Sequence, residues 1–92
     1  MKIGSYDFEP AKYFPEIDHL RAGAGQIGDT DDPRHVFFYD ADSGDPIGVE
    51  LFGPRAQLEG EGAITVMLPS GERVRVPEAE RLVREALAAD AA

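Results

Sequence analysis

The chain contains no cysteine, which rules out a disulfide scaffold, a thiolate metal site and a cysteine nucleophile. The fold must therefore rest on packing alone. Long apolar runs are also missing, because nowhere do about 18 apolar residues follow one another. The first residues lack the apolar stretch of a secretory signal. We expect a cytoplasmic protein that does not enter a membrane.

Basic residues are scarce, since nine Lys and Arg face 18 Asp and Glu and the net charge is −9. The imbalance lies mainly in residues 1–50, which hold eleven acidic and four basic residues. Binding of nucleic acids depends on Lys and Arg side chains that neutralise phosphates. We therefore expect that this chain alone does not bind nucleic acids. An acidic surface instead suits a basic protein partner. With 92 residues, enough for one hydrophobic core, we expect a single domain over residues 1–92.

The clearest positive pattern lies near the C-terminus, where apolar side chains recur at helical spacing. Five of them line one face: Ala79, Leu82, Val83, Ala86 and Leu87. Pro77 suits the first turn of a helix. The pattern predicts an amphipathic helix over residues 77–89, with Glu80 and Arg84 paired on its exposed side.

Strand-like segments precede this helix and come in pairs. Residues 63–68 and 72–76 are joined by Pro69, Ser70 and Gly71, which supply turn geometry. Residues 35–39 and 47–52 are joined by a segment rich in Asp and Gly. The pairing predicts two β-hairpins.

The remaining segments are less regular. Residues 2–6 are predicted to form a first strand, and residues 12–14 a short second one that Pro15 ends. Residues 21–34 show no hydrophobic period and are predicted to form a long Gly- and Asp-rich loop. The expected class is therefore α+β: a small antiparallel sheet of two hairpins and an N-terminal strand, with the helix packed on one face.

The segment 36–39 is apolar on both sides of a strand. Period-two alternation places Val36 and Phe38 on one face, and Phe37 and Tyr39 on the other. Because one helix covers only one face, we expect Phe37, Tyr39 and Phe52 to form an apolar patch that a second copy buries. The alternative is that residues 21–34 fold back over this patch. The candidate interaction surface comprises six residues: Phe37, Tyr39, Phe52, Asp40, Asp42 and Glu50.

Two motifs could carry chemistry but lack the right context. Residues 23–28 spell the Gly-x-Gly-x-x-Gly pattern of dinucleotide-binding loops, but an acidic segment follows where a helix should begin. Asp40, Asp42, Asp45 and Glu50 offer oxygen ligands, although their spacing does not fit an EF-hand. We predict a turn held by aspartate side chains that bind their own backbone. No catalytic residue, metal ligand or cofactor site is assigned.

The stretch from residue 3 to 52 resembles the family of short bacterial and archaeal domains of unknown function numbered twenty-two eighty-three. An opening and a closing block carry the resemblance: Tyr6, Asp7 and Glu9, then Asp40, Asp42, Gly44, Gly48, Val49, Glu50 and Leu51. Ala11 stands where the family has a second acid, and Pro15 interrupts its second strand. The resemblance implies an antiparallel-sheet domain without an established activity and links it to toxin and antitoxin gene pairs.

These observations favour a non-enzymatic protein-interaction module, which acts as a homodimer or binds another protein, with an antitoxin-like role fitting the acidic charge. The alternative is a small metal-dependent or carboxylate-based enzyme, or its accessory subunit, built on the hairpin that runs from Asp40 to Glu50.

Overall fold

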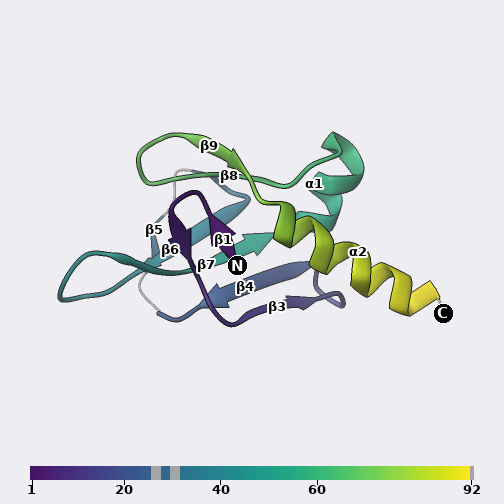
Figure 1. Ribbon diagram of the computed structural model, residues 1–92, viewed down its shortest axis with the longest axis horizontal. Coiled ribbons are helices and arrows are strands. Elements are labelled where there is room, and N and C mark those ends of the chain that lie inside the picture. Colours follow the sequence, from purple (N-terminus) through teal and green to yellow (C-terminus); the bar gives the residue numbers. More distant parts are fainter. Residues whose placement is uncertain (26–27, 30–31, 92) are drawn as a thin grey trace.

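A five-stranded antiparallel sheet forms the centre of the protein in a computed structural model that describes residues 1–25, 28–29 and 32–91. Its strands lie in the order β3–β4–β7–β6–β5, and neighbouring strands are antiparallel (Figure 1). Their bounds are Ala11–Phe14 for β3, His19–Gly23 for β4, Gly28–Asp29 for β5, His35–Tyr39 for β6 and Pro46–Phe52 for β7. The turn between β6 and β7 projects to one end of the molecule.

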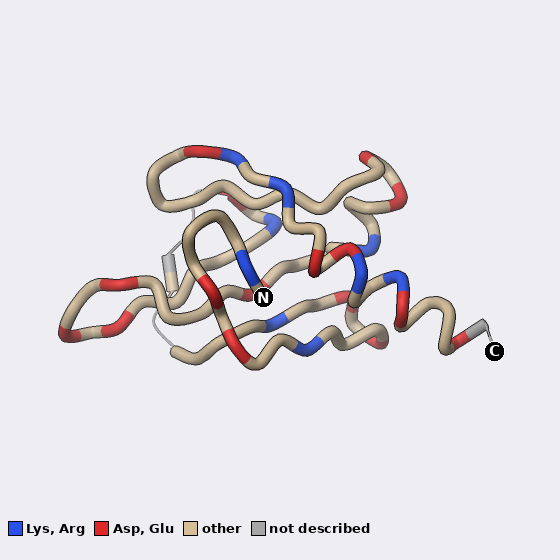
Figure 2. Tube along the Cα trace, viewed as in Figure 1, with Lys and Arg blue, Asp and Glu red and all other residues tan. Residues whose placement is uncertain are grey.

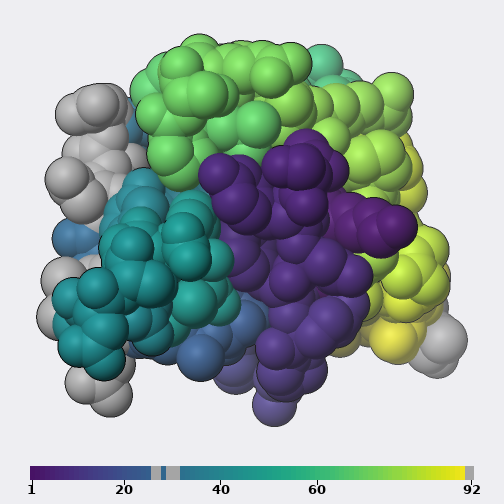
Figure 3. Space-filling view, turned by 60° about the vertical axis from the view of Figure 1, so that its left-hand side comes forward, coloured from purple at the N-terminus to yellow at the C-terminus, as the bar shows by residue number. Residues whose placement is uncertain are grey.

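Two short hairpins and two helices complete the fold. The elements are β1 (Lys2–Ile3) paired with β2 (Tyr6–Asp7), β8 (Thr65–Met67) paired with β9 (Arg73–Arg75), α1 (Pro54–Glu61) and α2 (Pro77–Ala91). In Figure 3 the N-terminal segment lies between the β6–β7 hairpin, the β8–β9 hairpin and α2. Antiparallel sheets combined with a C-terminal helix confirm the predicted α+β class.

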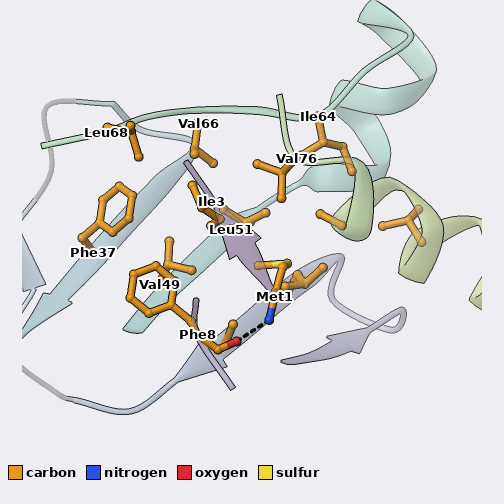
Figure 4. Packing of buried hydrophobic residues seen from close by; sticks show 14 of the residues in the cluster. Met1, Ile3, Phe8, Phe37, Val49, Leu51, Ile64, Val66, Leu68 and Val76 are labelled. Atoms are coloured by element: carbon orange, nitrogen blue, oxygen red, sulfur yellow. Dashed lines mark hydrogen bonds between the residues drawn. The ribbon is translucent and has the colours of Figure 1, made fainter. Parts of the chain in front are cut away.

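The hydrophobic core lies between one face of the five-stranded sheet and the elements that cover it. Its buried side chains are Met1, Ile3, Phe8, Leu20, Ala22, Phe37, Val49, Leu51, Leu58, Ile64, Val66, Leu68, Val76, Ala79 and Val83. Figure 4 shows how they converge, with the Met1 ammonium donating a hydrogen bond to the Phe8 carbonyl oxygen over 2.6 Å. The helix α2 is held by Ala79 and Val83, which are fully buried, while Leu82 packs at the margin of the core. Burial of this apolar surface is the main stabilising contribution.

The helix α1 has a weak sequence signature, because Leu58 is its only large aliphatic side chain. Its start is fixed by Asp18, which lies in the turn between β3 and β4. The Asp18 carboxylate accepts hydrogen bonds from the backbone N–H groups of Arg55 (2.9 Å) and Ala56 (3.2 Å). These donors have no partner inside the helix. The Tyr13 hydroxyl donates to the same carboxylate, and burial together with this hydrogen bond raises the pKa of Tyr13 to about 12.

We expect the substitution Asp18→Ala to lower the free energy of unfolding by about 1 to 2 kcal/mol, because the helix loses its cap. Asp18 has a positive φ of 51°, which alanine adopts less readily than aspartate. The control is therefore Asp18→Gly, which accepts this φ but also lacks the carboxylate. Urea unfolding of both variants measures the effect. If Asp18→Ala were as stable as the parent chain, the cap would contribute nothing, because alanine loses the carboxylate and relieves no strain at this φ.

The structure corrects several expected elements. Residues 21–34 do not form one loop, because 21–23 complete β4 and 28–29 form β5; residues 26–27 and 30–31 lie outside the described residues. The expected N-terminal strand is instead the β1–β2 hairpin, which turns at Gly4 (φ 60°). The two predicted hairpins exist but belong to different sheets. The helix α2 extends to Ala91 rather than to residue 89.

Candidate functional site

The two faces of the central sheet have different surroundings. Residues opposite each other on antiparallel strands share a face, and the next residue along each strand points to the other face. Leu20, Leu51 and His35 are opposite one another on the core side. The second surface, which we call the open face, carries seven described side chains that are exposed or partly exposed: Lys12, Phe14, His19, Arg21, Val36, Glu50 and Phe52. Lys12 is exposed and the other six are partly exposed.

Three rings form one row across the open face. Phe14 on β3 is opposite His19 on β4, which is opposite Phe52 on β7. The His19 and Phe52 rings meet edge to face, with their centroids 4.9 Å apart. The His19 side chain is 32% exposed. Such edge-to-face pairs are favourable because the ring edge is positive and the ring face negative.

Charged side chains form the next row of the open face. Lys12, Arg21 and Glu50 are opposite one another on β3, β4 and β7, and Val36 on β6 completes the row. The Glu50 side chain is 23% exposed, and its carboxylate lies 3.5 Å from Nδ1 of His19. Lys12 lies 5.1 Å from the centre of the Phe14 ring. The row therefore changes from positive on β3 and β4 to negative on β7.

The chain itself limits the open face at one end. After β4 it crosses above β7, so that a side chain at Gly48 would collide with the backbone of Ala24. The Arg21 side chain extends towards the crossing segment. Its guanidinium donates to the Gly25 carbonyl oxygen (2.6 Å) and lies 4.6 Å from the centre of the Phe38 ring. Phe38 is only 8% exposed as a result. The ring row and the rest of the charged row lie outside this covered end.

The residues predicted as an interaction surface do not lie together. Phe37 is 3% exposed and belongs to the core, and Tyr39 packs against that core, so the predicted patch of Phe37, Tyr39 and Phe52 does not exist. Alternation along β6 could not decide the matter, because both of its sides are apolar. The register decides it: Phe37 is opposite Val49, and both face the core. Phe52 and Glu50 lie on the open face.

The acidic turn between β6 and β7 is a local structure. Figure 2 shows its acidic residues at one end of the molecule. The Asp40 carboxylate accepts hydrogen bonds from the backbone N–H groups of Asp42 (2.9 Å) and Ser43 (3.0 Å), and these bonds lower the pKa of Asp40. The prediction that aspartate binds its own backbone in this turn is confirmed. Within the described residues, no three His, Asp or Glu side chains form a group suited to a metal ion.

A buried polar cluster lies on the core side of the sheet. Asp32 and His35 are 7% and 2% exposed. Burial alone would raise the pKa of Asp32, but hydrogen bonds from Arg73 (2.9 Å) and Arg34 hold it well below its usual range. Burial lowers the pKa of His35, whose Nε2 accepts a hydrogen bond from the Met67 N–H (3.2 Å). The cluster joins β6 to the β8–β9 hairpin and is a structural connection.

The same pattern joins α2 to β9. Glu80 was expected on the exposed side of the helix, but it is 1% exposed and accepts two hydrogen bonds of 2.7 Å from Arg75. The expected contact with Arg84 is present at 3.7 Å. Arg73 and Arg75 thus pair with acidic residues of the same chain.

No family model, curated protein or solved structure matches this chain. Among the described helices, none is both long and apolar enough to cross a membrane.

Proposed function

We propose that this chain is a non-enzymatic protein-interaction module that binds its partner through the open face. The observation that carries the proposal is the row of Phe14, His19 and Phe52, which stays partly exposed on a sheet face beside exposed and half-buried charges. A sheet face that only meets water is usually polar. Three neighbouring rings on such a face are therefore better explained by contact with another molecule.

The composition of the open face resembles that of protein interfaces. Aromatic residues and arginine are enriched in such interfaces, where they supply most of the binding energy. The open face combines Phe14 and Phe52 with Arg21 in adjacent rows. The ring row is thus suited to become the desolvated part of a contact, with the charged row beside it.

Nucleic acid is a poorer occupant of this face, although bases stack well on exposed rings. A nucleic-acid strand brings phosphates that need cations, and Glu50 lies within the charged row. The net charge of −9 adds a repulsion that acts over the whole molecule. A protein partner brings no row of phosphates to the face.

The proposal is tested by photochemical cross-linking in the cells that make the protein. Benzoylphenylalanine replaces Phe52 on the open face in one variant, and Glu85 on the exposed side of α2 in a control variant. We expect irradiation to link a second polypeptide to position 52 and not to position 85, because only the open face is in contact. Equal yields at both positions, or no product at position 52, would contradict the proposal.

A further inference from the structure

The rows of the open face allow a more specific statement, which rests on the proposed function. We infer that the partner is a second copy of this chain, packed sheet to sheet about a two-fold axis that runs parallel to the strands, midway between β4 and β7. Two copies related in this way present the same surface to each other.

The axis exchanges the two central strands. The β4 strand of each copy comes to lie above β7 of the other copy, and every row stays above the equivalent row. Arg21 and Glu50 are opposite each other on β4 and β7. In the dimer, Arg21 therefore releases the Gly25 carbonyl oxygen that it binds within its own chain and meets Glu50 of the second copy, and the same contact occurs again on the other side of the axis. Packed sheets lie about 10 Å apart, a separation that an arginine and a glutamate side chain bridge together.

The ring row matches itself in the same arrangement. His19 and Phe52 are also opposite each other on β4 and β7. The axis places His19 above Phe52 of the second copy, so four rings come together near the centre of the interface. Aligned sheets cross at about 30°, which keeps these rows in contact near the axis. The contact then consists of an aromatic row at the end of the sheet and a charged row beside it.

The distribution of charge favours a second copy over a partner of one sign. A purely basic surface would match Glu50 but repel Lys12 and Arg21, and a purely acidic surface would do the reverse. The charged row carries both signs in an order that the two-fold axis makes complementary. Like charges facing each other at an interface are costly, so this order also selects against other arrangements.

The test is a charge exchange followed by sedimentation equilibrium. The parent chain should show the mass of two chains at micromolar concentration. Arg21→Glu places Glu against Glu in its own dimer, and Glu50→Arg places Arg against Arg, so each variant should associate at least about tenfold more weakly. In an equal mixture of the two variants both contacts are again of opposite sign, and the mass of two chains should return. Arg81→Glu, at an exposed position of α2, should leave the mass unchanged.

Three outcomes would overturn the inference. A parent chain with the mass of one chain at all concentrations up to about 100 μM would exclude the dimer, and this measurement does not depend on any variant. A dimer that both exchanges leave intact would exclude the open face as its interface. A mixture that stays dissociated, although circular dichroism shows both variants to be folded, would exclude the proposed axis. If position 52 nevertheless cross-links to a different protein, the proposed function stands and only the second copy is wrong.

Discussion

Replacing Phe37 with alanine is expected to lower the free energy of unfolding by about 4 kcal/mol, because the large ring leaves a cavity in a core that cannot fully close around it. Phe37 is 3% exposed, and its ring packs against Phe8 and His35 at centroid distances of 6.1 and 5.7 Å. Urea unfolding followed by circular dichroism measures the change.

The neighbouring residue provides the control for Phe37. Val36 lies on the open face and is partly exposed, so Val36→Ala should cost about 1 kcal/mol or less. If the two substitutions destabilised the chain equally, β6 would have the opposite orientation. That orientation is the one expected from the sequence, with Phe37 and Tyr39 on the face away from the helix.

The second large effect is expected for Glu80→Ala, which should cost about 3 kcal/mol at neutral pH. Glu80 is buried, its carboxylate binds Arg75 through two hydrogen bonds, and it also accepts the backbone N–H of Ile64 (3.1 Å). Alanine leaves that N–H without a partner inside the protein. Glu85→Ala is the matched control, since this exposed residue on the same helix lies 3.7 Å from Arg81 in a surface ion pair and should change stability by less than about 0.5 kcal/mol.

The contribution of Glu80 should also depend on pH. The hydrogen bonds from Arg75 lower the pKa of Glu80 from 4.5 to about 2, against the opposing effect of burial. A depressed pKa means that the stabilisation is complete above pH 4.5 and is lost as the pH falls towards 2. This lowering corresponds to about 3 kcal/mol. The stability of Glu80→Ala should therefore fall less steeply over this range, and parallel curves for the two proteins would show that Glu80 is not the group responsible.

The sequence predicts those elements that carry their own pattern. The helix α2 follows from apolar spacing, and the hairpins of β6–β7 and β8–β9 follow from apolar segments around turn residues. The strand β4 was missed, although His19, Leu20, Arg21 and Ala22 alternate between open face and core. That alternation was the available signal, and the glycines that follow obscured it. The helix α1 was missed because its cap, Asp18, lies far away in the sequence.

The candidate site could be predicted only in part. Phe52 and Glu50 were named from the sequence and do lie on the open face, but their neighbours Phe14, His19 and Arg21 come from strands whose pairing the sequence does not specify. Phe37 was assigned to the wrong face of the sheet, because a strand that is apolar on both faces does not indicate which of them is buried. The register between strands is set by the packing of the whole sheet, which no local pattern contains.

The capping of α1 by Asp18 has a consequence for the order in which the chain folds. A helix of eight residues is too short to be stable alone, and the partner of its first N–H groups lies 37 positions earlier in the chain. We therefore expect α1 to form late in folding, after the β3–β4 turn has reached the end of β7. Asp18→Ala should then accelerate unfolding and leave the rate of refolding nearly unchanged, a difference that stopped-flow kinetics resolves.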